Sequence, residues 1–207
     1  MGPFPDGVYR AQFPYYYRNP EGMPQEAALD YYLNSIKDVF EQCGPADSIA
    51  AIVVEPLQGE GGFIPAPIEW VKAVRKICDE NGILLVADEV QTGFCRTGRM
   101  FATQYWEEAG VQPDILATAK SIAAALKTIE IMERDDLAGC SCEIGEKVSK
   151  RFNEWKEKYP VIGDVRGLGG MIGLEFVKDQ KSKEPYPEFS AAVISGCAKK
   201  GLMIEGA

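Results

Sequence analysis

Residues 83–98 read ILLVADEVQTGFCRTG, and this stretch decides the fold. Its first five residues, Ile83–Ala87, form a continuous apolar run of strand length, which is typical of a buried strand in a parallel sheet. The run delivers Asp88 into a loop that contains glycine. A second strand-like run, PDILATAK at residues 113–120, ends at Lys120. Each of the two runs therefore leads to a side chain that can carry charge.

Helical and strand patterns alternate in the same part of the chain. Apolar residues at helical spacing predict helices over residues 25–43 and 68–80, each followed by a glycine that is a typical end signal. Residues 47–54 are rich in β-formers and end just before Glu55. The recurrence of strand, helix and strand predicts βαβ units and a doubly wound α/β domain with a mostly parallel sheet.

The C-terminal half has a different order of elements. Its patterns predict mostly helix over residues 121–158, a β-hairpin with a Gly-rich turn over 161–179, a helix over 188–200 and the start of a strand after it. Asp135-Asp136 and Gly139 are expected to interrupt the helical region. We therefore expect a partial large α/β domain at residues 1–136 and a partial small α+β domain at residues 137–207.

The composition excludes several classes of function. The 207 residues carry a net charge of −9, which argues against electrostatic binding to nucleic acid or to anionic membranes. No apolar run reaches the length of a membrane span, and the N-terminus lacks a secretory signal pattern. We therefore expect a soluble protein with neither a nucleic-acid nor a membrane partner.

The cysteines and the missing histidine narrow the chemistry further. Six scattered cysteines with no CxxC pair are typical of a reduced, cytoplasmic protein. Their spacings do not support a zinc site, so we expect no metal centre. Because the chain contains no histidine, Ser-His and Cys-His mechanisms are excluded.

The charged side chains at the strand ends suggest a specific cofactor. Ligands of such sheets gather at the carboxyl ends of the strands, and Glu55, Asp88 and Lys120 all follow such ends. A lysine alone there is usually a surface residue, and a carboxylate alone is usually a helix cap or turn residue. Together, however, a carboxylate that keeps a pyridine nitrogen protonated and a lysine that forms a Schiff base are what pyridoxal 5′-phosphate (PLP) requires.

Neighbouring residues extend this hypothesis. Lys120, once released from the cofactor, is the expected general base that moves the substrate α-proton. Gln91 can donate a hydrogen bond to the ring hydroxyl, and Val90 offers an apolar face to the ring. Glu89 is expected only to shape the turn.

Four longer motifs carry a resemblance to a known family: AAIVVEPLQGEGGF, LLVADEVQTGFCRTGRMF, PDILATAKSIA and VRGLGGMIGLEF. Together they resemble class III aminotransferases of PLP fold type I, and most closely the 4-aminobutyrate aminotransferase group. The resemblance implies transfer of an amino group from an ω-amino acid to a 2-oxo acid such as 2-oxoglutarate. It also implies that Glu55 and Glu60 border the substrate, with Glu60 as a switch residue whose arginine partner would lie beyond Ala207.

The chain departs from the family pattern in two respects. Family members are about twice as long and have an N-terminal part that binds the cofactor phosphate and stacks an aromatic ring on PLP. In addition, SIAA runs directly into ALKTIE, which indicates an internal deletion near Ala124. The deleted segment carries a threonine that reaches the phosphate in the partner subunit of the family homodimer. We therefore expect weak or absent PLP binding, and the loss of this shared loop argues against the family homodimer.

The sequence leaves three alternatives to this hypothesis. The chain could be another class III PLP enzyme, such as an aminomutase, a racemase or a decarboxylating relative. It could instead be a non-catalytic fragment. The glycines of VRGLGG also invite a dinucleotide-binding reading, but they lie between two strand-like runs rather than between a strand and a helix, which argues against it.

Overall fold

The computed structural model describes residues 6–118 and 122–206. They form two compact units that interleave along the chain. The first unit holds the described residues up to Pro56 together with Ala66–Glu89 and Thr103–Thr118. The second holds Leu57–Pro65, Val90–Ala102 and the described residues from 122 onward. The predicted boundary at residue 136 remains a prediction.

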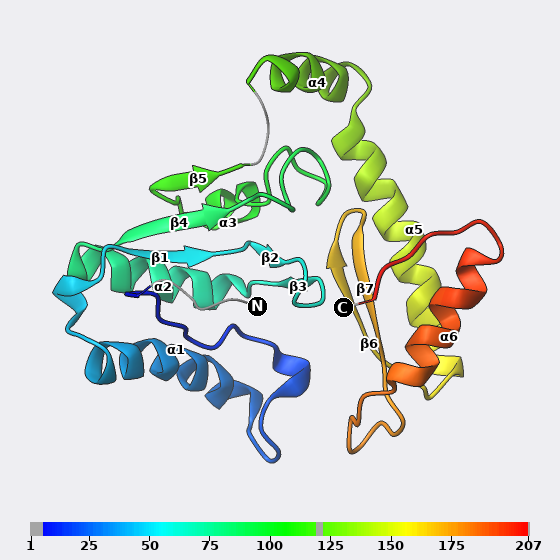
Figure 1. Cartoon of the computed structure of the whole chain (residues 1–207), viewed down its shortest axis with the longest axis horizontal. Coiled ribbons are helices and arrows are strands. Elements are labelled where there is room, and N and C mark those ends of the chain that lie inside the picture. Colours follow the sequence, from blue (N-terminus) through cyan, green and yellow to red (C-terminus); the bar gives the residue numbers. More distant parts are fainter. Residues whose placement is uncertain (1–5, 119–121, 207) are drawn as a thin grey trace. The chain divides into compact units, whose positions relative to one another are not determined.

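A three-stranded parallel sheet organises the first unit (Figure 1). Its order is β1-β4-β5, with β1 at Ala51–Val54, β4 at Leu84–Asp88 and β5 at Ile115–Ala117. Because β4 pairs in parallel with both neighbours, its carboxyl end lies at the same sheet edge as theirs. The predicted α/β class and parallel sheet are confirmed.

Helices cover one face of this sheet. They are α1 (Gln25–Gln42), α2 (Ile68–Asn81) and α3 (Gln104–Glu108), with short 3₁₀ turns η1 (Tyr16–Arg18) and η2 (Ala46–Ser48). The shared core draws on both longer helices and the sheet, and its members include Tyr32, Ile36, Trp70, Val71, Val74, Ile83, Leu85 and Trp106. Gly82 ends α2 at φ +67°, a left-handed conformation that glycine adopts at little cost.

The opposite face of the sheet is largely bare in the described residues. Alternate residues of β4 point to opposite faces, and Leu85 is fully buried whereas Leu84 is 45% exposed. Val53 and Ile115, which lie on the Leu84 face by their register, are 65% and 48% exposed. The expectation of a buried strand was therefore wrong for Leu84, because the described helices of this unit pack on the opposite side of the sheet. By the same alternation, Asp88 belongs to the bare face.

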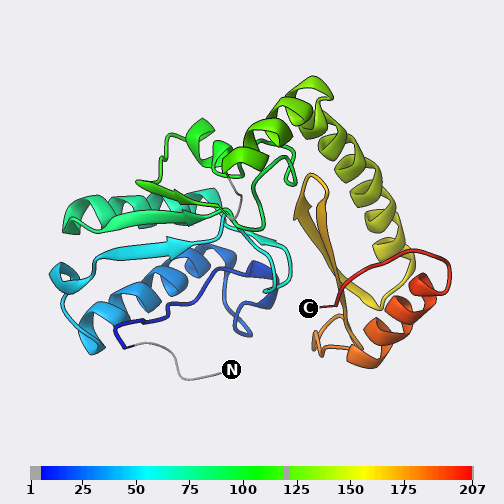
Figure 2. The ribbon, with the colours of Figure 1, turned by 45° about the horizontal axis from the view of Figure 1, so that its top comes forward.

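The second unit is built around a β-hairpin. Its strands β6 (Ile162–Leu168) and β7 (Met171–Phe176) pair antiparallel, and α5 (Leu137–Lys158) and α6 (Pro187–Ala198) lie along the same side of them (Figure 2). Helix α4 (Ile122–Arg134) precedes α5. A second, minimal hairpin pairs β2 (Leu57–Gln58) with β3 (Ile64–Pro65) around the turn at Gly59–Phe63.

Most of the expected elements of this unit are confirmed. The helical region breaks at Asp135-Asp136, but Gly139 does not interrupt it. Instead, the Asp136 carboxylate accepts a hydrogen bond from the Gly139 N–H and caps α5. The strand expected after residue 200 was wrong for the described residues, since no neighbouring strand pairs with that segment. Within the described chain, no helix combines the length and hydropathy that crossing a membrane requires.

Candidate active site

The carboxyl edge of the parallel sheet brings two of the predicted site residues together. Val54 pairs with Ala87, so the residues that follow them, Glu55 and Asp88, continue neighbouring strands at one edge. Both side chains are partly buried. This edge is where sheets of this class bind their ligands.

Glu89 has a more definite role than the sequence suggested. Its side chain is fully buried, and its carboxylate accepts a hydrogen bond of 2.7 Å from the Thr103 N–H. Its own N–H donates to the Ala117 carbonyl at 2.9 Å and so extends the pairing of β4 with β5. Glu89 therefore ties the two ends of the loop at residues 90–102 and stabilises the strand end that carries Asp88.

Asp114 fixes the opposite end of the same strand pair. Its carboxylate accepts hydrogen bonds of 2.7 Å from both the Leu85 N–H and Arg75 Nη1. The bond from Arg75, followed by the bond from Leu85, holds the pKa of Asp114 below its usual value. Because β4 and β5 are fixed at both ends, the position of Asp88 is set by backbone pairing rather than by a flexible loop.

The remaining described site residues lie in the second unit. A methyl group at buried Gly59 would overlap the Gln91 side-chain amide, so that amide lies directly against the Gly59 backbone. The Gly59 carbonyl accepts hydrogen bonds from the N–H groups of Gly62 and Phe63. This turn contains Glu60, which is exposed.

The structure describes Val90 but not Lys120. Val90 is 52% exposed, so an apolar side chain is accessible there. Lys120 lies outside the described residues. Glu55 and Asp88 thus belong to the first unit and Glu60, Val90 and Gln91 to the second. Their assignment to a common site remains a prediction.

The comparison with protein families identifies the chain. The family model described as aminotransferase class-III matches residues 1–124 and 121–207. The chain belongs to the class III aminotransferases. This family is PLP-dependent, and the resemblance seen in the sequence motifs is confirmed.

Named relatives show the range of class III chemistry. The probable 4-aminobutyrate aminotransferase of Bacillus subtilis (strain 168) is 36% identical over 239 residues, covering 99% of this chain and 54% of the relative. The isoleucine 2-epimerase of Lentilactobacillus buchneri is 33% identical, covering 99% of this chain and 53% of the relative. Class III aminotransferase relatives therefore include enzymes of two reaction types.

Solved class III structures share the fold. An amine transaminase from an uncultivated Pseudomonas species, in its PLP-bound form, superposes with a TM-score of 0.83 at 30% identity. That match covers 94% of this chain and 54% of the transaminase chain. The chain thus spans about half the length of the class III proteins that it matches.

The matches also locate an internal gap. The family model matches in two pieces that meet at residues 121–124. The alignment with the Bacillus subtilis relative runs over 239 positions although the whole chain has 207 residues, so the relative contains residues with no counterpart here. The break in the family match coincides with the deletion predicted near Ala124.

Proposed function

We propose that this chain carries the ring-binding part of a class III aminotransferase that transfers an amino group from an ω-amino acid, such as 4-aminobutyrate, to a 2-oxo acid such as 2-oxoglutarate. The single observation that carries the proposal is the placement of Asp88 beside Glu55 at the carboxyl edge of a parallel sheet, in a chain of this family. The six cysteines are scattered and form no CxxC pair, which favours a reducing compartment, and we propose the cytoplasm as the location of the chain.

The described residues fit the ring of PLP. Asp88 offers a carboxylate at a strand end on the bare face of the sheet, where a planar ligand has access. The sequence then supplies an exposed apolar side chain at Val90 and a hydrogen-bond donor at Gln91. An acid, an amide and an apolar surface are the groups that a protonated pyridine ring with a hydroxyl substituent requires.

Each residue has one proposed task. When bound, PLP supplies an electron sink for the substrate carbon that carries the amino group. Asp88 keeps the proton on the ring nitrogen, because a neighbouring carboxylate favours the charged form of that nitrogen. Gln91 donates to the ring hydroxyl and orients the ring. Lys120 would bind the cofactor covalently, and its released amine would take the proton from the substrate carbon that carries the amino group and deliver it to the cofactor. Glu55 and Glu60 border the substrate.

The phosphate of PLP loses one expected partner at the internal gap of this chain. The family match breaks at residues 121–124, where the resemblance implies a lost segment with a threonine that reaches the cofactor phosphate. Charge-assisted hydrogen bonds to a phosphate contribute strongly to affinity, so their loss weakens binding. We therefore propose that this chain binds PLP only at high cofactor concentration.

A titration with PLP tests the proposal. We expect visible absorbance of lysine-attached PLP to appear only at millimolar cofactor, and borohydride reduction should fix the label on Lys120, as read by peptide mass spectrometry. Lys120→Ala should abolish the label, whereas Lys127→Ala, which removes an exposed lysine of α4, should keep it. A label that is independent of Lys120 would contradict the assignment, and saturation at micromolar PLP would contradict the weak binding.

The epimerase and racemase relatives support a second candidate function. An epimerase or racemase needs the same lysine and ring carboxylate but returns the proton without transferring the amino group. Incubation with a single-enantiomer amino acid and 2-oxoglutarate separates the two reactions. Glutamate formation supports transamination, and inversion at the α-carbon without glutamate supports racemisation.

A third candidate, a non-catalytic fragment, is favoured by the internal gap and the bare sheet face. It predicts no Lys120-dependent labelling at any PLP concentration.

A further inference from the structure

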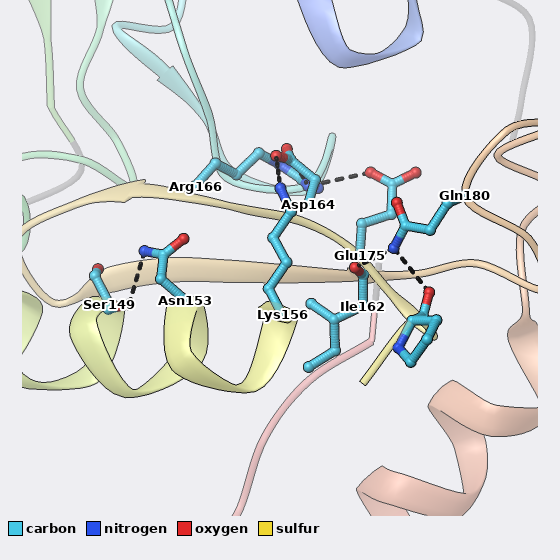
Figure 3. Close-up of polar contacts among 9 residues, drawn as sticks. Ser149, Asn153, Lys156, Ile162, Asp164, Arg166, Glu175 and Gln180 are labelled. Carbon is cyan, nitrogen blue, oxygen red and sulfur yellow. Dashed lines mark hydrogen bonds and ion pairs between the residues drawn. The ribbon is translucent and has the colours of Figure 1, made fainter. Parts of the chain in front are cut away.

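A partly buried charge cluster in the second unit holds the turn at Gly59–Phe63, which we call the Glu60 turn. At its centre, Arg166 on β6 lies between Asp164 on the same strand and Glu175 on β7 (Figure 3). Arg166 Nη1 is 3.2 Å from Asp164 Oδ2 and 3.1 Å from Glu175 Oε2, and the three side chains are only 14–17% exposed. Lys156 of α5 approaches the other Asp164 oxygen at 3.9 Å.

The same guanidinium also binds the Glu60 turn. Arg166 Nε donates a hydrogen bond of 2.7 Å to the Gly62 carbonyl, across 104 positions of sequence. A Cβ atom at Gly62 would lie 2.9 Å from Arg166 Nη2, and Gly62 adopts φ +112°. The positive φ therefore favours glycine at this position, and the turn lies directly against the guanidinium.

The β6–β7 hairpin has a glycine where the Glu60 turn packs against it. Gly173 on β7 pairs with Arg166, and a Cβ atom at Gly173 would lie 3.1 Å from the Gly62 carbonyl oxygen. The next residue of the turn, Phe63, has φ +54°, a conformation that costs a non-glycine residue free energy. A strained turn of this kind persists only where surrounding contacts hold it.

The held turn leads directly to the predicted site residues. Gly62 and Phe63 donate their N–H groups to the Gly59 carbonyl, and Gly59 packs against the Gln91 amide. Glu60 lies inside the same turn. A displacement of Gly62 would therefore move Glu60 through the backbone of the turn. It would also move the Gln91 amide through its packing contact with Gly59.

We propose that Arg166 is a positioning residue for the active site: by holding Gly62 it sets the Glu60 turn and, through Gly59, the orientation of the Gln91 amide. The inference rests on the proposed function for the roles of Glu60 and Gln91. Arginine suits this task because its planar fork serves a carbonyl and two carboxylates at once. Lysine has a single nitrogen and cannot make the same set of bonds.

Two substitutions separate positioning from general hairpin stability. Arg166→Lys keeps the charge that Asp164 and Glu175 require but removes the Nε donor to Gly62. Glu175→Gln removes one charge pair but leaves the Arg166–Gly62 bond intact. We therefore expect the two variants to affect different parts of the unit.

The readout is nuclear magnetic resonance of the isotope-labelled chain without cofactor. In Arg166→Lys we expect amide exchange at Gly62 and Phe63 to become about tenfold faster and the Gln91 side-chain amide signals to shift, because a hydrogen bond of this kind contributes about one decade of local protection. In Glu175→Gln both readouts should match the wild type. Gly62→Ala, which disturbs the contact from the other side, should reproduce the Arg166→Lys pattern.

Each other outcome overturns the inference. Unchanged exchange and unchanged Gln91 signals in Arg166→Lys would show that the turn holds itself. Equal changes in Arg166→Lys and Glu175→Gln would show that the cluster only stabilises the hairpin. Neither readout needs PLP. A failure of cofactor binding would therefore overturn the proposed function, but the result of this NMR test would still stand.

Discussion

At the scale of single residues, the two adjacent acids at the end of β4 have different tasks. Asp88 ends the strand and belongs to the bare face of the sheet, whereas Glu89 is fully buried and accepts a hydrogen bond from the Thr103 N–H. The sequence predicted the position of Asp88, because an apolar run before a carboxylate is a local signal. It could not predict the task of Glu89, because the partner of that side chain lies 14 positions away.

Removal of the Glu89 carboxylate should destabilise the fold measurably. Glu89→Ala leaves the buried Thr103 N–H without this acceptor and opens a cavity, so we expect the free energy of unfolding to fall by about 2–3 kcal/mol. Urea unfolding followed by circular dichroism measures the change. Glu41→Ala, which truncates an exposed glutamate of α1, should stay within about 0.5 kcal/mol of the wild type. A Glu89→Ala loss no larger than that of Glu41→Ala would contradict the role assigned to Glu89.

At the scale of elements, the sequence predicted the regular pieces and missed those set by long-range contacts. Helices α1 and α2, strand β4 and the β6–β7 hairpin each follow from periodicity over a few residues. The sequence did not indicate the minimal β2–β3 hairpin, because its shape depends on Arg166 from a distant strand. One signal was available: Asp164 and Arg166, two positions apart on a strand, must share a face.

The packing of α5 on the β6–β7 turn depends on one small residue. Gly145→Ala would place a methyl group into the Gly169 carbonyl oxygen, so we expect a loss of about 1–3 kcal/mol in the free energy of unfolding. Gly196→Ala in α6 is the matched control, because open space surrounds that position. It should instead stabilise the chain by about 0.5–1 kcal/mol through helix propensity. Thermal and urea unfolding of both variants measure the changes in stability. Similar changes in Gly145→Ala and Gly196→Ala would contradict the close contact between Gly145 and the Gly169 carbonyl oxygen.

The anchoring of β4 to β5 by Asp114 predicts a pH dependence. Arg75 and the Leu85 N–H lower the pKa of Asp114 in the folded chain, so the unfolded chain binds more protons in acid. The stabilising effect of the carboxylate is therefore complete above the pKa of an unfolded aspartate, about 3.9, and is lost as the pH falls through the lower folded-state pKa.

Asp114→Asn should remove this dependence. We expect the variant to be less stable at pH 7 and to lose less stability than the wild type between pH 5 and pH 2, as urea unfolding across that range would measure. Asp38→Asn, on the exposed surface of α1, should keep the acid sensitivity of the wild type. An unchanged slope in Asp114→Asn would show that other carboxylates account for it.

At the scale of the whole molecule, the chain has the family fold over about half of the length of its relatives. The four sequence motifs were sufficient to predict the family, because each is a contiguous string, and the direct junction of SIAA with ALKTIE predicted the internal gap. They could not predict the bare sheet face, since local sequence does not tell whether a second layer of helices is present. Leu84 was expected to be buried but is 45% exposed, and Val53 and Ile115 on the same face are exposed as well.

This apolar face should be detectable in solution. We expect the chain to bind the dye ANS in its native state, and the double variant Val53→Thr, Ile115→Thr to bind less, because it replaces exposed methyl groups while keeping β-branched side chains. Its free energy of unfolding should change by less than about 1 kcal/mol. Met203→Thr, at a residue that is 92% exposed, should leave dye fluorescence at the wild-type level. Equal dye fluorescence in the wild type, the double variant and Met203→Thr would show that the dye does not bind to the bare face of the sheet.

The 104-position separation between Arg166 and Gly62 also bears on the order in which the chain folds. The β6–β7 hairpin closes locally and can form within microseconds, whereas joining Arg166 to Gly62 requires closure of a loop that is half the length of the chain. Contacts of such long range form slowly. We therefore expect the Glu60 turn to gain its order late in folding, so that refolding followed at this turn lags behind refolding followed at the hairpin.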